Sequence, residues 1–150
     1  MTSVKNDDEM RAFGQKLGER LRGGEVIELI GDVGAGKTTL VKGIGVGLAV
    51  DDDVQSPSFT ISRVYQVRDG LELHHYDFYR LSDAGVMQYE LAESADDARA
   101  ITVIEWAETV HDVLPSKRCI IRIEYTPDGA GRNVTITAPS TYEYLLEGAS

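Results

Sequence analysis

Hydrophobic positions along the chain follow two periods, one typical of helices and one typical of strands. Met10, Phe13, Leu17 and Leu21 recur at helical spacing, and Gly23-Gly24 predicts where that helix ends. Short apolar runs between turn residues predict β-strands over residues 25–30, 60–67, 71–76, 101–104, 118–125 and 133–138. Further helices are predicted over 40–48, from Ser82-Asp83, over 107–114 and after Ser140.

This mixture of strands and helices predicts an α/β fold in which a sheet is flanked by helices. Asp69-Gly70 is a hairpin turn signal between two of the strand-like runs, so the sheet is expected to be mixed rather than purely parallel. The chain has 150 residues, the size of one ordinary domain, and 42% of them are hydrophobic. We therefore expect a single three-layer domain over residues 1–150.

Charge and composition narrow the range of partners. Twenty-five acidic residues against fifteen basic ones give a net charge of −10. Because phosphate neutralisation needs a basic surface, this balance argues against tight binding to nucleic acid by this chain alone. No segment approaches the ~20 apolar residues of a membrane span, so no membrane contact is expected. The one cysteine, Cys119, lies in a predicted strand and cannot form an internal disulfide, which favours a cytoplasmic location and a buried, structural role.

The strongest local motif lies between the strand over 25–30 and the helix over 40–48. Residues 31–38 read GDVGAGKT and fit the phosphate-binding pattern G-x-x-x-x-G-K-[ST] at every fixed position. Glycines let backbone N–H groups wrap a phosphate chain, and the helix that follows presents its positive end to the same phosphates. Lys37 is expected to reach the terminal phosphates and the Thr38 hydroxyl to bind Mg²⁺. The sheet is thus predicted to be that of a P-loop NTPase-like domain.

Gly43, Gly45 and Gly47 superficially resemble a dinucleotide-binding fingerprint. They lie inside the predicted helix rather than between a strand and a helix, so we interpret them as positions where this helix packs closely on the sheet.

Hydrolysis needs a carboxylate near Mg²⁺ and a group that positions water. Glu105 ends a buried apolar run and Asp77 ends a more polar one, so both are candidates, while either is also compatible with an ordinary surface acid. Trp106 is compatible with stacking on a base or with filling the core. The segment over 56–60 is compatible with a phosphate-sensing loop or a simple turn. His74 and His75, without a nearby cysteine or third histidine, are not expected to bind a metal.

The set of segments resembles the TsaE (YjeE) family, small bacterial ATPases of tRNA threonylcarbamoyladenosine biosynthesis. The P-loop and its helix, SPSF at 56–59, HHYDFYRL at 74–81, EWAE at 105–108 and GRN at 131–133 are similar to family motifs in order and spacing. Ser58 replaces a threonine, Phe78 a leucine and Ala107 a proline. None of these departures removes an expected metal ligand.

The resemblance implies a set of site residues. Glu105 and Lys37 are expected to be catalytic, and Thr38, Asp77 and Glu105 to gather around Mg²⁺. ATP is expected to contact Gly34, Ala35, Gly36, Lys37, Thr38, Thr39, Ser58, Trp106 and Arg132.

The resemblance also implies partners. The family works with TsaD and TsaB, which modify adenosine 37 of tRNA, and it supports them through ATP binding and hydrolysis. Contact with tRNA is then expected only indirectly, through the complex.

Three other functions are compatible with a P-loop. A small-molecule kinase is the main alternative, although no arginine-bearing lid segment stands out. A GTPase is disfavoured because the chain has no Asn-Lys-x-Asp sequence that would read guanine. A subunit that only needs bound nucleotide for assembly would not require turnover.

Overall fold

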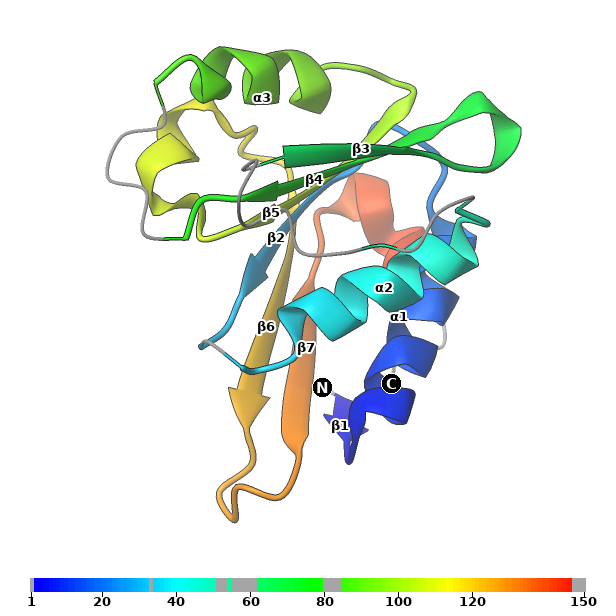
Figure 1. Ribbon diagram of the computed structural model, residues 1–150, viewed down its shortest axis with the longest axis vertical. Coiled ribbons are helices and arrows are strands. Elements are labelled where there is room, and N and C mark those ends of the chain that lie inside the picture. Colours follow the sequence, from blue (N-terminus) through cyan, green and yellow to red (C-terminus); the bar gives the residue numbers. More distant parts are fainter. Residues whose placement is uncertain (1, 33, 51–53, 55–61, 80–84, 147–150) are drawn as a thin grey trace.

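The computed structural model describes residues 2–32, 34–50, 54, 62–79 and 85–146. Ser58, the segment over 56–60 and the helix start expected at Ser82-Asp83 lie outside these residues. In chain order the elements are β1 (Thr2–Val4), α1 (Asp7–Arg20), β2 (Val26–Ile30), α2 (Lys37–Gly47), β3 (Ser62–Gln66), η1 (Arg68–Gly70), β4 (Glu72–Asp77), α3 (Met87–Ala95), β5 (Ala100–Glu105), η2 (Ala107–Val113), β6 (Cys119–Tyr125), β7 (Arg132–Thr137) and η3 (Ser140–Leu146), where η marks a 3₁₀ helix (Figure 1).

The strands of the described residues form one seven-stranded sheet in the order β1-β7-β6-β2-β5-β4-β3. Strands β6, β2, β5 and β4 are parallel neighbours, and β1, β7 and β3 pair antiparallel at the two sides. Every residue of β5 is buried, as expected for a central strand covered on both faces. The predicted α/β fold with a mixed sheet flanked by helices is therefore confirmed.

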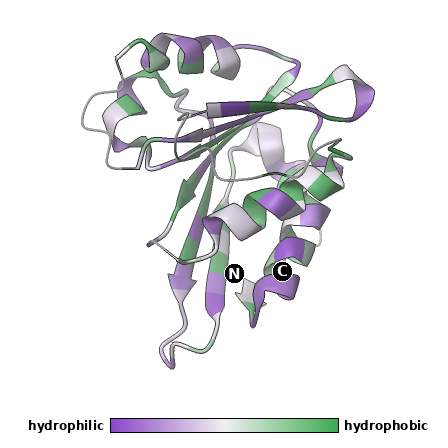
Figure 2. Ribbon diagram, in the orientation of Figure 1, coloured by the Kyte–Doolittle hydropathy of each residue, from purple (hydrophilic) through white to green (hydrophobic). Residues whose placement is uncertain are grey.

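Helices cover the two faces of the central strands, and each face has its own hydrophobic core (Figure 1). Ile27 and Leu29 of β2 point into the core beneath α1 and α2, whereas Val26 belongs to the core beneath α3 and η2. Figure 2 shows hydrophilic residues where β6 ends and β7 begins, beyond the central strands. The alternation along β2 thus fixes which side chains face each helical layer.

Helices α1 and α2 pack backbone against backbone through glycines. A Cβ at Gly14 would overlap the Leu40 carbonyl oxygen, and one at Gly43 would overlap the Arg11 carbonyl oxygen. Gly47 makes the equivalent approach to α1. The expectation that the α2 glycines pack on the sheet is wrong for Gly43 and Gly47, because their close neighbour is α1. Gly45 faces the side chains of Val50 and Val54 instead.

Two further features were not evident from hydrophobic periodicity. The short strand β1 pairs with β7 at the edge of the sheet, and the segment expected as a helix over 107–114 is the 3₁₀ helix η2.

Cys119 is fully buried, and burial raises the pKa of its thiol to about 12, in keeping with a structural role. Among the helices that the structure describes, none is both long and apolar enough to cross a membrane.

We expect Gly43→Ala to lower the free energy of unfolding by about 2 kcal/mol, because the added methyl group meets the backbone of α1 and the helices must separate to admit it. Urea denaturation measures this. Lys16→Ala, at an exposed position of α1, is the control and is expected to change the stability by less than about 0.5 kcal/mol. An equally small effect of Gly43→Ala would contradict the close packing of the two helices.

Candidate nucleotide site

The loop between β2 and α2 has the backbone conformation that its glycines predict. Gly34 and Gly36 adopt φ angles of 82° and 109°, in the left-handed region that favours glycine. Gly36 is the N-cap of α2 and provides no side chain to cap it. The first N–H groups of α2 are therefore available to an anion at the positive end of the helix dipole.

Two carboxylates lie beside this loop because two parallel strands end in register. Asp77 of β4 pairs with Glu105 of β5, and Glu105 in turn lies opposite Leu29 of β2. Burial raises the pKa of Asp77, and the nearby Glu105 carboxylate adds to this effect, while the Tyr79 N–H donates to Asp77 and opposes it. The structure thus places the two acids predicted from sequence side by side, at the carboxyl ends of two adjacent parallel strands.

Lys37 is buried among these acids. Burial lowers the pKa of its ammonium, and the carboxylates of Glu105 and Asp77 oppose that shift more than any other charge. The ammonium donates a hydrogen bond to the carbonyl oxygen of Gly31, within its own loop. It also lies 3.7 Å from the ring centroid of Trp106. The lysine is therefore held by the loop and an aromatic face, and a phosphate would have to compete with the Gly31 carbonyl for it.

Trp106 lines the site and is also packed, partly buried, against the core beneath α3 and η2. It directly follows Glu105 and has a left-handed φ of 57°, which turns the chain at the end of β5. Its ring contacts that of Tyr79, with the two centroids 4.9 Å apart.

His75 is a residue of this site that the sequence reasoning missed. Its Nε2 lies 2.6 Å from Oε2 of Glu105, and both side chains are at least 96% buried. Nδ1 of His75 has no hydrogen-bond partner among the described residues, so Glu105 is the described group that engages this ring. The pair fixes the orientation of the Glu105 carboxylate. The adjacent histidines in a strand that ends at Asp77 were the available signal.

Arg132 supports the loop from the start of β7, which is separated from β2 by one strand, β6. Its Nε donates to the Ala35 carbonyl oxygen at 3.2 Å, and its guanidinium lies 3.9 Å from the ring centroid of Tyr125. Tyr125 and Arg132 are directly opposite each other on β6 and β7. The arginine expected to contact ATP therefore contacts the P-loop backbone.

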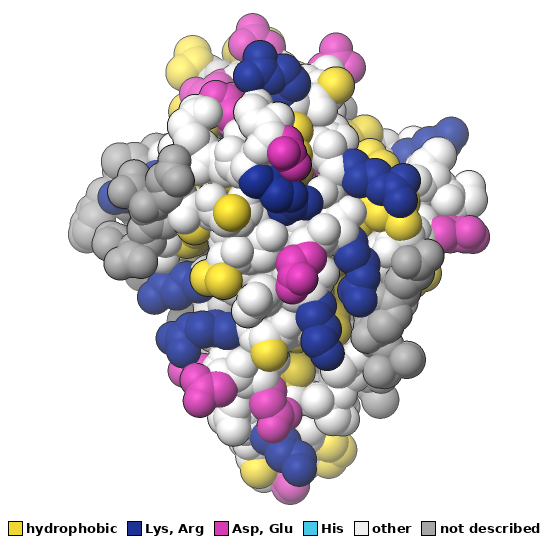
Figure 3. All heavy atoms as spheres, turned by 90° about the vertical axis from the view of Figure 1, so that its right-hand side faces the viewer, with side chains coloured by type: hydrophobic (Ala, Val, Ile, Leu, Met, Phe, Trp, Pro, Cys, Tyr) yellow, Lys and Arg dark blue, Asp and Glu magenta, His cyan; other side chains and the backbone are white. Residues whose placement is uncertain are grey.

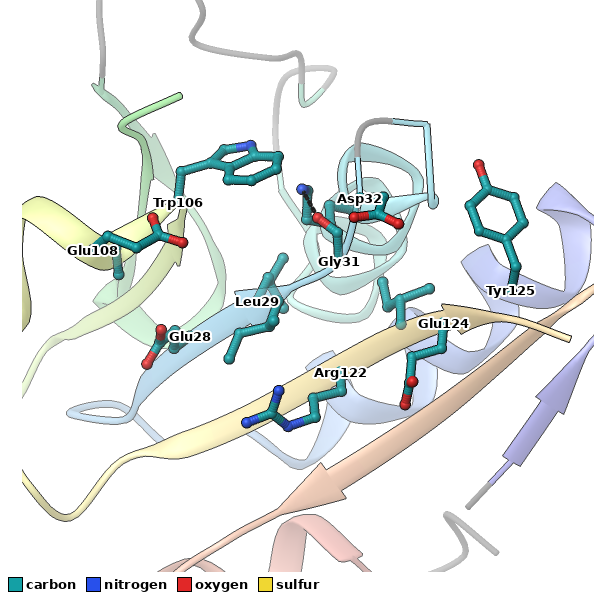
Figure 4. A pocket seen from close by; sticks show the side chains of 13 residues that line it. Glu28, Leu29, Gly31, Asp32, Trp106, Glu108, Arg122, Glu124 and Tyr125 are labelled. Carbon is teal, nitrogen blue, oxygen red and sulfur yellow. Dashed lines mark hydrogen bonds between the residues drawn. The ribbon is translucent and has the colours of Figure 1, made fainter. Parts of the chain in front are cut away.

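Lys37, Trp106 and Tyr125 line a cavity of about 460 Å³ (Figure 4). Asp77, Glu105 and Arg132 are not among its lining residues. Trp106 and Tyr125 stand at its two ends, and Gly31 and Asp32 lie between them. Another lining residue, Glu28, accepts one hydrogen bond from Nε of Arg118 and pairs with His111. The cavity is large enough for a small phosphorylated ligand.

The residues predicted for the metal are oxygen donors of the kind that Mg²⁺ prefers. Thr38 follows Lys37 in the first turn of α2, while Asp77 and Glu105 supply carboxylates. Among the described residues no group of three or more His, Cys, Asp or Glu side chains is arranged to hold a metal. Mg²⁺ usually takes one or two carboxylates and completes its shell with water and substrate phosphates, so this donor set fits it.

We expect His75→Leu to lower the free energy of unfolding by about 3 kcal/mol, because it leaves the buried Glu105 without its partner. In a Glu105→Gln background the same change should cost at least 1 kcal/mol less, since no charge is then stranded. Urea denaturation of the four proteins measures this coupling. His74→Leu combined with Glu72→Gln is the matched control, because Glu72 is more exposed and its coupling should be smaller. Additive effects of His75→Leu and Glu105→Gln would contradict the coupling.

The chain was also compared with known proteins. The sequence model described as "Threonylcarbamoyl adenosine biosynthesis protein TsaE" matches residues 4–134. The tRNA threonylcarbamoyladenosine biosynthesis protein TsaE of Streptomyces coelicolor is 38% identical over 132 residues, covering 85% of this chain and 89% of the relative. The TsaE protein of Bacillus subtilis is 36% identical and covers 97% of this chain and 90% of the relative.

A solved structure agrees with these sequence relatives. The crystal structure of Bacillus subtilis YdiB is similar with a TM-score of 0.76 and 30% identity, covering 99% of this chain and 91% of that one. The likeness extends over the whole sheet and both helical layers rather than the P-loop alone. The chain belongs to the TsaE family.

Proposed function

We propose that this protein binds ATP with Mg²⁺ and hydrolyses it in support of threonylcarbamoyladenosine formation in tRNA. The observation that carries the proposal is the convergence of the P-loop Lys37 with Asp77 and Glu105 at one edge of the sheet. The family and the names of its relatives supply the pathway.

The chain's own groups suit a polyphosphate. Residues 34–39 include the start of α2, whose first backbone N–H groups are available to an anion, and Lys37 supplies a cation at the cavity. Phosphate oxygens would replace the Gly31 carbonyl as the partner of the Lys37 ammonium. That exchange strengthens the interaction, because a charged acceptor takes the place of a neutral one.

Mg²⁺, when bound, would neutralise charge on the phosphates, with Thr38, Asp77 and Glu105 as its protein ligands. Glu105 is also the group best placed to orient a water and accept its proton, because His75 fixes its carboxylate. Asp77 and Glu105 are neighbouring like charges, and the Lys37 ammonium interacts with both of them.

Lys37→Ala should abolish measurable ATP binding while leaving the fold intact, because the change removes the charge aimed at the phosphates. Isothermal calorimetry measures the affinity. In the wild type, the fluorescence of Trp106 should change on saturation, since the Lys37 ammonium lies against its ring and moves to the phosphates. Lys42→Ala, on the same helix but beyond its first turn, is the control and should bind ATP normally. Equal ATP affinity in Lys37→Ala and wild type would rule out this loop as the phosphate site.

Asp77→Asn and Glu105→Gln should each lower Mg²⁺-dependent ATP hydrolysis at least tenfold while changing ATP affinity much less. Both substitutions keep the shape and remove a charge that acts on the metal or the attacking water. Release of phosphate without any added acceptor also distinguishes an ATPase from a small-molecule kinase. Unchanged turnover in both variants would make these two residues ordinary buried acids.

We propose TsaD and TsaB as the partners, with tRNA held by them. The net charge of −10 opposes approach to a polyanion. On the side where α1 and α2 lie, Lys and Arg side chains are interspersed with Asp and Glu instead of forming a basic stripe (Figure 3).

Glu105→Gln also separates partner binding from hydrolysis. This variant should retain ATP-dependent capture of purified TsaD and TsaB and fail to support tRNA modification in a reconstituted assay. Full modification activity with Glu105→Gln would show that turnover is dispensable, and submicromolar tRNA binding by the chain alone would contradict the indirect role.

A further inference from the structure

We propose that Glu28 is a positioning residue that holds η2 against the sheet and thereby keeps the Trp106 ring over the Lys37 ammonium. The inference rests on the proposed function and deepens it, because it assigns a residue that acts on the phosphate end of the site through another element. Glu28 lies outside the P-loop pattern and outside the other family motifs identified in the sequence.

Glu28 interrupts a strand that is otherwise apolar. Strand β2 reads VIELI, and Glu28 is 4% exposed. Val26, two residues earlier, belongs to the core beneath α3 and η2, so the Glu28 side chain lies on that face of the sheet. A buried carboxylate is costly, and replacing a buried ion pair by well-packed apolar residues is often neutral or stabilising. The acid at this position therefore needs an explanation other than stability.

The Glu28 carboxylate joins β2 to η2 and to the start of β6. Its Oε1 accepts a hydrogen bond from Nε of Arg118 at 2.8 Å. Its Oε2 lies 3.1 Å from Nε2 of His111 in η2, and because an ionised carboxylate only accepts, this nitrogen carries the hydrogen. Arg118 also donates to the carbonyl oxygen of Pro115, which follows η2. One carboxylate thus holds both η2 and the turn after it.

Helix η2 depends on tertiary contacts for its position. It is a 3₁₀ helix of seven residues, which is long for this kind of helix, and 3₁₀ hydrogen bonds have poorer geometry than those of an α-helix. Ala107 and Val110 pack it into the core beneath it. The bond from His111 to Glu28 adds a polar anchor at the next residue after Val110.

The start of η2 lies against Lys37. Trp106 is the N-cap of this helix, and its ring centroid lies 3.7 Å from the Lys37 ammonium. Figure 4 shows Glu28, Trp106 and Glu108 at the same end of the cavity. A ring held over the ammonium limits its contact with water, and charges attract each other more strongly where water is excluded. The position of η2 therefore sets how strongly Lys37 attracts phosphates.

Glu28→Ala and His111→Ala should each weaken MgATP binding about fivefold, because a loosened η2 admits water to the Lys37 ammonium. Trp106 is the only tryptophan of the chain, so quenching of its fluorescence by acrylamide in the ligand-free protein measures how well the ring is held. Quenching should increase in both variants. The double variant should lose much less than the sum of the two single effects, since both changes remove the same contact.

Two controls separate this role from a general loss of stability. Asp112→Ala changes the exposed residue next to His111 in η2 and should leave ATP affinity and quenching unchanged. Glu72→Ala removes a carboxylate that pairs with His74 at the start of β4, the end remote from Asp77. It should also leave both measurements unchanged, whatever it does to the free energy of unfolding.

Isothermal calorimetry and acrylamide quenching distinguish the outcomes. Loss of ATP affinity in Glu28→Ala but not in His111→Ala would overturn the proposal, because Glu28 lines the cavity and would then act by direct contact, whereas His111 is not a lining residue. Unchanged quenching in His111→Ala would also overturn it. This variant replaces a half-exposed side chain, so the test does not depend on whether Glu28→Ala folds.

Failure of the wild-type protein to bind ATP would overturn the proposed function itself. Quenching of the ligand-free variants would then still show whether Glu28 holds η2 and the Trp106 ring.

Discussion

The buried ammonium of Lys37 is the interaction on which the geometry of the site depends. A cation withdrawn from water is costly unless acceptors and opposite charges surround it. Here the Gly31 carbonyl, the Trp106 ring and the carboxylates of Asp77 and Glu105 provide that environment. Together with His75, the same ammonium offsets the repulsion between two acids that lie side by side at the ends of parallel strands. The loop, β4 and β5 are therefore electrostatically coupled through one side chain.

The position of that ammonium depends in turn on how α2 packs against α1. Lys37 is the first residue of α2, so any shift of the helix moves the lysine relative to the strand ends. Gly14, Gly43 and Gly47 let α1 and α2 approach with their backbones in contact, and this close approach leaves little room for displacement. Packing that is remote from the phosphates thus sets the geometry of the charge that would meet them.

Sequence reasoning succeeded where the determinants are local. The P-loop pattern, the buried runs that became β2 and β5, and the hairpin turn at Asp69-Gly70 each depend on residues adjacent in the chain. It failed where distant segments meet. His75 and Glu105 are 30 positions apart in the sequence, and no residue near His75 indicates that Glu105 is its partner. The sequence around the glycines of α2 does not indicate whether a sheet or another helix packs against them. Strand β1 has too few residues to show the alternation of hydrophobic and polar positions that predicts a strand.

A chain with a net charge of −10 that binds a polyanion requires local fields to outweigh the overall charge. Exposed acids on the outer surfaces lie in water, where screening over about 8–10 Å weakens their effect on the cavity. Lys37 and Arg132 are close to the loop and partly shielded from solvent, and the start of α2 adds a positive dipole end. Phosphates would therefore meet positive groups at the loop itself, whereas the rest of the cavity lining carries more acids than bases. A tRNA approaching from outside would meet the acidic average instead. In the proposed function, this local difference would let the protein bind a nucleotide while its proposed partners hold the tRNA.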